Sequence, residues 1–315
     1  AGHSATMDLP LRNRGLEFEL GYTPPELVEG LALTFNGNLT TVSNELVALA
    51  EGISVYSPVG LDGVASSFAD AYRTEVGQPI GYFYGYQTCG LFQSAADVTA
   101  RAVPDNQTAD AGVPPEPGDV CFADVNGDGE ITADDRTYLG KTIPDFYYGF
   151  NVNARYKGFD LGLFFNGVSG VQAYNQVRQS FEQADGGSQN RFASALDYWT
   201  PQNTDTNIPR AFDGDPNNNY RFSDRYVEDA GYLRLRSLQI GYTLQENLLG
   251  IPAGTRIYLA GSNLFTITDY SGLDPEFQTS IDFVRSRNEV ATFSGTDTGN
   301  TPQPRVFQIG VSTSF

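Results

Sequence analysis

Histidine is nearly absent from this sequence, and its scarcity limits the chemistry that the chain can perform. The only histidine, His3, lies near the N-terminus, so we expect neither a serine–histidine catalytic pair nor a histidine-ligated zinc site. Acidic pairs such as Asp134 and Asp135 fall in Asp-rich loops, where solvated turn residues are more common than an acid and base pair. We therefore predict that the chain is not an enzyme.

Basic residues and long apolar runs are also scarce. The chain has 19 Lys and Arg against 38 Asp and Glu, a formal net charge of -19, which disfavours nucleic acid and anionic membrane surfaces as partners. The acidic charge serves either solubility or loops that bind cations. No apolar run reaches the roughly 18 residues of a transmembrane helix, which leaves a transmembrane β-barrel, with its alternating strands, as the membrane alternative.

Cysteine is rare, and the two cysteines, Cys89 and Cys121, both fall in loop sequence. They form either a disulfide in an oxidising compartment or two free thiols. We predict the disulfide, which would close a loop of about thirty residues and stabilise the fold by about 3 to 4 kcal/mol. The opening residues, AGHSATMDLP, lack the basic and apolar regions of a signal peptide, so we expect a mature or truncated chain.

Aromatic residues and glycine are abundant instead, at 13% aromatic content and 34 glycines, as is typical of long-stranded β proteins. The clearest pattern is DFYYGFNVNARYKGFDLGLFFNGV, residues 145–168, in which two alternating runs meet at Lys157 and Gly158. It predicts a β-hairpin with one apolar face, one polar face, and Arg155 directly opposite Asp160. Such a hairpin fits either a tall soluble sheet or a wall between lipid and a watery lumen.

Similar alternation predicts seven strands, at residues 15–23, 29–41, 145–156, 158–168, 231–244, 254–266 and 304–315. Within the fifth strand the apolar positions change parity, which places a β-bulge near Ser237. The connections alternate between short and long, so the turns near 24–29, 157–158 and 245–253 should share one rim of an antiparallel sheet. Short turns on one rim and long loops on the other are typical of outer-membrane β-barrels.

Seven strands leave two unpaired edges, which are costly in lipid, so we expect the chain to be part of a larger barrel or one chain of a split barrel. The long loops offer two weaker signals. Residues 79–92, PIGYFYGYQTCGLF, predict a short hairpin or a packed aromatic loop, and residues 192–199 predict a helical turn.

Eight stretches in this order resemble the C-terminal third of a SusC-type (SusC/RagA) TonB-dependent outer-membrane receptor. They are NRGLEFELGY, GQPIGYFYGYQTCGLFQ, PGDVCFADVNGDGEITADDRTYLG, PDFYYGFNVNARYKGFDLGLFFNGVSG, YWTPQNTDTNIPR, GYLRLRSLQIGYTL, RIYLAGSNLFTITDYSGLDPE and VFQIGVSTSF. The resemblance implies an all-β fold, with residues 1–315 forming the C-terminal segment of a large antiparallel transmembrane β-barrel of 22 strands that carries long extracellular loops. Cys89 and Cys121 depart from the family pattern, and the plug domain, the TonB box and the earlier strands are not in this sequence.

The resemblance also implies partners and a location. They are a SusD-like surface lipoprotein, the TonB-ExbB-ExbD complex acting through the N-terminal part, and the lipid of the outer membrane of a Gram-negative, Bacteroidetes-like bacterium. The disulfide between Cys89 and Cys121 would then lie on the extracellular side.

The sharpest chemical motif is DVNGDGEITADD, residues 124–135, which follows the spacing of a calcium-binding loop. The predicted ligands of a structural Ca²⁺ are Asp124, Asn126, Asp128, the backbone carbonyl of Glu130, and Asp135. Asp135 replaces the usual Glu, and clear flanking helices are missing, so the loop resembles a dockerin-like or surface loop. The alternative is a turn-rich loop that uses Asp, Asn and Gly for its backbone shape.

Two further expectations concern aromatic residues. Tyr82, Tyr84, Tyr86 and Trp199 either stack on a ligand's sugar rings or pack the loops against the barrel. The last strand ends on Phe315, which has the form of the assembly signal of outer-membrane barrels and would also suit an interfacial aromatic girdle.

The leading hypothesis is a segment of an outer-membrane TonB-dependent importer that captures an oligosaccharide or peptide. The alternative is a secreted, calcium-dependent adhesin or glycan-binding module rich in β-structure. A third hypothesis is a passive porin, although such long loops do not favour it.

Overall fold

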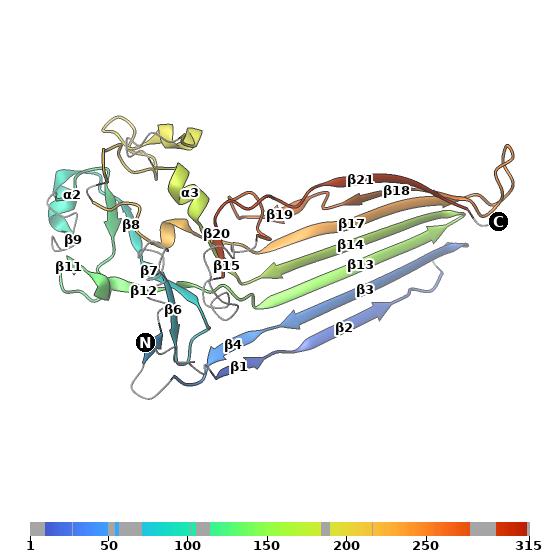
Figure 1. Cartoon of the computed structure of the whole chain (residues 1–315), viewed down its shortest axis with the longest axis horizontal. Helices are drawn as coiled ribbons and strands as arrows, with labels where there is room; N and C mark the ends of the chain where they lie inside the picture. The colour runs from blue at the N-terminus through green and yellow to red at the C-terminus, as the bar shows by residue number, and fades with distance from the viewer. Residues whose placement is uncertain are drawn as a thin grey trace, which may run out of the picture.

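The computed structural model describes residues 10–26, 28–49, 54–56, 71–101, 103–104, 114–183, 190–215, 217–277 and 294–313. Within these ranges, no helix combines the length and the hydropathy that crossing a membrane requires. The chain divides into one long sheet and a layer of shorter elements at one end of it (Figure 1).

The long sheet is antiparallel, and its strands follow the order β2-β3-β13-β14-β17-β18-β21. Their bounds are Glu17–Tyr22 (β2), Leu31–Thr41 (β3), Phe146–Tyr156 (β13), Phe159–Ser169 (β14), Tyr232–Thr243 (β17), Arg256–Ser262 (β18) and Val306–Ser312 (β21). A short strand, β19 (Thr266–Thr268), also pairs with β17. All seven predicted strands are therefore confirmed, and the sheet has the architecture of a segment of barrel wall.

The two faces of this sheet differ in polarity because side chains alternate along each strand. The apolar face carries large side chains that the structure leaves exposed, among them Phe18, Leu20, Phe159, Leu259, Phe307, Ile309 and Val311. The opposite face carries amides, hydroxyls and charges, among them Asn36, Asn151, Asn153, Arg155, Asp160, Gln239 and Arg256. Exposed apolar area of this extent marks a surface that contacts lipid or another protein.

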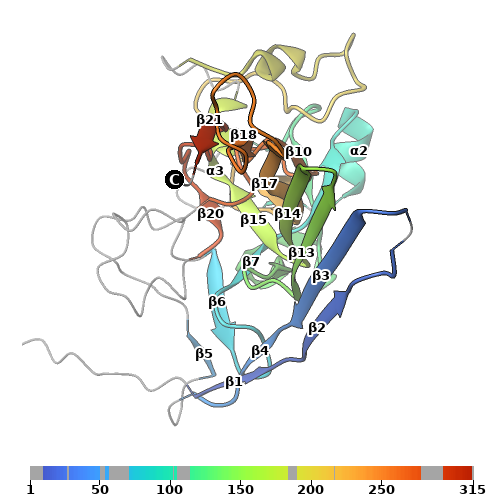
Figure 2. The same cartoon turned by 90° about the vertical axis from the view of Figure 1, so that its right-hand side faces the viewer.

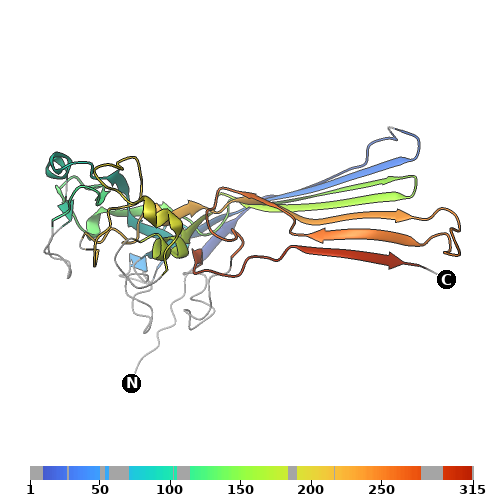
Figure 3. The same ribbon diagram turned by 90° about the horizontal axis from the view of Figure 1, so that it is seen from above.

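The three short turns lie together at one end of the sheet (Figures 1 and 3). Tyr156, beside the second turn, pairs with Leu31, beside the first turn, and with Phe159. Phe159 also pairs with Tyr242, which lies beside the third turn. The predicted segregation of turns and long loops is therefore confirmed.

The predicted β-bulge is present on β17. The register with β14 shifts between Phe164 and Phe165, whose partners are Ser237 and Leu235, so Arg236 is the extra residue. Arg236 donates a hydrogen bond to Asn166 Oδ1 at 3.2 Å, and Arg234 is the cross-strand partner of Asn166. The bulge thus turns both arginines toward the polar face and away from the apolar one.

Short elements form the layer beyond the opposite rim, and Figure 2 shows them behind the ends of the long strands. A four-stranded sheet has the order β12 (Arg136–Gly140), β7 (Tyr82–Tyr86), β6 (Tyr72–Glu75) and β5 (Val55–Tyr56). Smaller sheets pair β1 (Leu11–Arg14) with β4 (Ser43–Leu46), β8 (Thr88–Leu91) with β10 (Val120–Phe122), β9 (Val103–Pro104) with β11 (Glu130–Ile131), and β15 (Gln172–Asn175) with both β16 (Val227–Asp229) and β20 (Thr296–Asp297).

Short helices complete this layer. They are α2 (Ala95–Ala100), α3 (Gln176–Phe181) and 3₁₀ turns at Ala133–Asp135, Ala193–Asp197 and Asp224–Tyr226. The helical turn predicted at 192–199 is confirmed. For residues 79–92 the two alternatives are a short hairpin and a packed loop. The packed alternative is the correct one, because β7 pairs with β6 and β12 whereas β8 pairs with β10.

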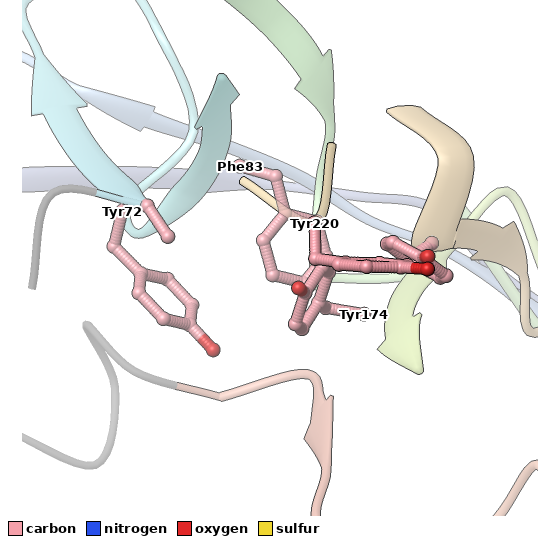
Figure 4. Close-up of a cluster of buried hydrophobic side chains, with 6 residues drawn as sticks. Tyr72, Phe83, Tyr174 and Tyr220 are labelled. Carbon is pink, nitrogen blue, oxygen red and sulfur yellow. The ribbon is translucent and has the colours of Figure 1, made fainter. Parts of the chain in front are cut away.

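The loop layer has its own core. Tyr72, Phe83, Tyr174, Tyr220 and Tyr226 are buried together, and Figure 4 shows four of them converging from separate elements. Phe222 packs at the edge of the cluster, with its ring centroid 4.4 Å from that of Tyr174. Because these residues come from segments far apart in the sequence, the long loops fold as one packed unit.

Candidate functional site

The polar face of the long sheet forms a hollow of about 880 Å³ near the turn rim. Two of the residues that line it, Asp160 and Arg256, form an ion pair, with Arg256 Nε 2.8 Å from the carboxylate. Gly241 lies between them, and a Cβ there would come within 2.5 Å of both charged groups. Asp160 is opposite Arg155 in the register as predicted, but its ion pair goes to Arg256 because glycine leaves the path across β17 open.

The predicted calcium loop is folded around its own carboxylates. Asp124 accepts hydrogen bonds from the backbone N–H groups of Gly127 at 2.6 Å, Asp128 at 3.2 Å and Gly129 at 2.8 Å. Gly127 and Gly129 have φ of 79° and 90°, a region that favours glycine. Asn126 Nδ2 donates to Asp128 at 2.9 Å. The loop therefore presents its oxygen atoms on a tight, preformed backbone.

Asp135 closes this loop from the other end. It is fully buried, and its carboxylate accepts hydrogen bonds from Val125 N at 2.9 Å and Thr132 N at 2.7 Å. No group of three or more acidic, cysteine or histidine side chains converges on one point in the described part of the chain. Asp135 thus acts as a structural clasp here, and metal binding stays a prediction.

Cys89 and Cys121 are joined by a disulfide, with Cα atoms 5.1 Å apart. The bond links β8 to β10, which are already paired by backbone hydrogen bonds. Cys121 is buried, and its chain neighbours Val120 and Phe122 belong to a second core cluster, which also contains Leu91, Ile131 and Trp199. The disulfide therefore ties together the strand pair that leads into the 124–135 loop.

The predicted ligand aromatics occupy different environments. Trp199 is buried in the second core cluster and donates its indole N–H to Gln93 at 3.1 Å. Tyr86 also packs there, against Phe122. Neither Trp199 nor the buried Tyr82 exposes a ring face on which a sugar could stack. Phe315 lies outside the described residues.

Tyr84 lies on a face of the four-stranded sheet that we did not predict from the sequence. In the register, Tyr138 is opposite Tyr84, and Arg136 is opposite Tyr86. On the other side of β7, Arg73 is opposite Tyr82. The alternation in RTYLG, residues 136–140, could have indicated a strand, but only the fold shows that it joins β7.

Guanidinium groups surround the Tyr84 ring on this face. Arg73 Cζ lies 4.2 Å from the ring centroid and Arg136 Cζ lies 5.6 Å from it. Tyr138 is 42% exposed, and its ring centroid is 5.2 Å from that of Tyr82. The pKa of Tyr82 is raised, chiefly by burial and next by its hydrogen bond to Glu75, so this tyrosine stays neutral.

Comparisons with known proteins show that the chain is similar to part of several TonB-dependent receptors. It is 34% identical to the TonB-dependent receptor P3 of Formosa agariphila, over 97% of this chain and 29% of that relative. It is 23% identical to the TonB-dependent receptor SusC of Bacteroides thetaiotaomicron, over 97% of this chain and 26% of SusC. No family model matches the chain.

A solved structure of the RagAB peptide transporter has the same fold. It matches with a TM-score of 0.69 and 22% identity, over 96% of this chain and 29% of that one. The chain thus spans less than a third of the length of the relatives it matches. Over nearly its whole length, this chain is a relative of SusC/RagA-type TonB-dependent receptors, as its sequence motifs indicate.

Proposed function

We propose that this chain forms barrel wall and extracellular loops of a longer TonB-dependent importer in the outer membrane of a Gram-negative bacterium. The observation that carries the proposal is the long sheet itself. One face is apolar and exposed, the other is polar, and all its short turns share one rim. Lipid on one side and a watery lumen on the other account for both faces.

The sheet edges support membership in a larger barrel. Within the described residues of the long sheet, β2 pairs only with β3, and β21 pairs only with β18. Each free edge would leave backbone N–H and C=O groups unpaired in hydrocarbon, at a cost of several kcal/mol per group. Further strands of the same receptor would pair both edges and close the barrel.

The proposed cargo is an oligosaccharide or a peptide, taken up with a SusD-like surface lipoprotein and energised through TonB-ExbB-ExbD. RagAB is described as a peptide transporter, and relatives of the P3 and SusC type are TonB-dependent receptors. In this function the chain moves its ligand without making or breaking a covalent bond.

Deletion of the receptor gene tests this proposal. Cells without the receptor should lose uptake of one class of oligosaccharide or peptide, and the tagged receptor should fractionate with the outer membrane together with a surface lipoprotein. Unchanged uptake and recovery of the protein in the culture medium would instead favour the secreted adhesin. The relatives described above are all receptors or transporters, which favours import.

A second proposed property is a structural Ca²⁺ in the 124–135 loop. The observation that favours it is the tight turn in which Asp124 accepts three successive backbone N–H groups. Asp124, Asn126 and Asp128 would supply side-chain oxygens, and Glu130 would supply its carbonyl, as hard cations prefer. Asp135 would join them if one of its oxygens exchanged a backbone N–H for the ion.

Calorimetric titration of the intact receptor with Ca²⁺ tests this site. The Asp124→Ala, Asp128→Ala double variant should lose one binding event, because two of the anionic ligands are gone. Asp134→Ala is the matched control, since Asp134 belongs to the same loop but not to the ligand set. Equal Ca²⁺ binding by the double variant and the unaltered receptor would show that this loop is not a Ca²⁺ site.

A further inference from the structure

The cationic face of the four-stranded sheet suggests which ligand the loops take. Arg73, Tyr84, Arg136 and Tyr138 lie on one side of β6, β7 and β12. The opposite side of the same strands carries Tyr72 and Phe83, which are buried in the core of the loop layer (Figure 4). The core fixes the sheet, so the tyrosines and arginines of the first side are held in place on a rigid support.

The two guanidiniums are unusual in this acidic protein. The chain carries a net charge of -19, yet Arg136 forms no ion pair with any residue that the structure describes. Its Nε donates to the carbonyl of Ala133 at 3.2 Å. Arg73 Nε is 3.4 Å from Glu75 but is buried and makes no hydrogen bond.

The ring of Tyr84 helps to stabilise both positive charges. Each guanidinium is within reach of the electron-rich ring face, and this attraction offsets part of their mutual repulsion. The terminal N–H groups of both arginines make no hydrogen bond within the described ranges. They remain available to a planar anion, which a guanidinium can bind through two parallel hydrogen bonds.

The exposed ring of Tyr138 adds a second requirement. Tyr138 lies two residues from Arg136 on the same strand, so both side chains point to the same side. A ligand for this face must therefore present a flat apolar surface beside an anionic group. A uronic acid or a sulfated sugar combines both features in one residue, whereas the acidic side chains of a peptide carry no ring.

We propose that Arg73, Arg136 and Tyr138 form a binding site for an acidic oligosaccharide, one that bears carboxylate or sulfate groups on its sugar rings. This inference rests on the proposed import function and narrows its cargo. Glu75 opposes the anion, since its carboxylate lies beside Arg73 and accepts a hydrogen bond from Tyr82 at 3.0 Å. Substitution of Glu75 should therefore strengthen binding, whereas substitution of the neighbouring Arg73 should weaken it. This pair of opposite effects would identify the site.

Binding to the intact receptor, purified in detergent, tests the site with tetragalacturonate as the probe. Arg73→Gln and Arg136→Gln should each weaken binding by about tenfold or more, because each removes charged hydrogen bonds. Tyr138→Ala should weaken it as well. Glu75→Gln should strengthen it, and added salt should weaken binding to the unaltered receptor.

Arg14→Gln is the matched control, because it makes the same change in net charge at an exposed arginine on β1 and should leave binding unchanged. Equal binding by Arg136→Gln and Arg14→Gln, or failure of tetragalacturonate to bind at millimolar concentration, would overturn the proposal. Preference for tetraglutamate over tetragalacturonate would overturn the sugar assignment. The assay does not measure uptake, so a failed import function and a failed binding site give separate results.

Discussion

An arginine at Leu238 should sharply reduce the amount of receptor in the outer membrane, whereas an arginine at the adjacent Gln239 should leave that amount nearly normal. Leu238 lies midway along β17 on the apolar face, and its cross-strand partners are Leu163 and Gly261. Gln239 points to the opposite, polar face and lines the hollow. A charge facing lipid near the middle of the bilayer costs about 2 to 4 kcal/mol, while one facing the lumen is hydrated.

Quantitative blotting of outer-membrane fractions measures this difference, with heat-modifiable migration as the check that the barrel has closed. The two substitutions introduce the same side chain at neighbouring positions of one strand, so differences in charge and size cancel. Similar levels of both variants would mean that the two faces have the same surroundings, and the assignment of lipid to the apolar face would then be wrong.

The barrel-wall strands could be predicted because their information is local. Alternation within each run fixes which residues share a face, and the parity change in residues 231–244 reveals the bulge at Arg236 without any knowledge of the neighbouring strand. The turn at Lys157 is equally local, with φ of 47° followed by Gly158 at 86°. These two residues set the register that places Arg155 opposite Asp160.

The loop layer could not be predicted in the same way. Its strands are short, and their partners lie far away in the sequence, as for β7 with β12 or the parallel pairing of β15 with β20. Alternation in Tyr82–Tyr86 identifies two faces but not the strand that pairs with it, so Arg136 and Tyr138 could not be joined to Tyr84. The ion pair between Asp160 and Arg256 likewise depends on what lies between them, which is Gly241.

Replacement of Arg234 by methionine should loosen the segment 269–277 more than any comparable change at the surface. Arg234 is 2% exposed and holds three groups: Asp274, Glu276 at 3.0 Å and Thr266 at 2.9 Å. Asp274 is also buried, so the substitution leaves it without its cation. Loss of one partner of a buried ion pair costs about 3 to 5 kcal/mol.

Hydrogen exchange of residues 269–277 in the intact receptor measures this loss. Arg12→Met is the control, because Arg12 pairs with Glu45 at 3.5 Å on the surface, where such pairs contribute about 0 to 1 kcal/mol. Protection should fall in the Arg234 variant and stay unchanged in the control. Equal protection in both would show that the cluster around Arg234 does not hold this segment.

The effect of pH on the hydrogen-exchange protection of residues 269–277 should reverse in the Arg234→Met variant. Burial raises the pKa of Asp274, but the hydrogen bonds from Arg234 and from the backbone of Gln303 lower it by more than burial raises it, so the net shift is downward. A lowered pKa stabilises the fold above the unfolded value of about 3.9, and this stabilisation is lost as the pH falls through the folded pKa. Without Arg234, burial dominates and the pKa of Asp274 should rise.

Acidification should then loosen residues 269–277 in the unaltered receptor and tighten them in Arg234→Met, after correction for the intrinsic exchange rate. Loosening of both proteins by acid would mean that Asp274 keeps its charge through a group other than Arg234.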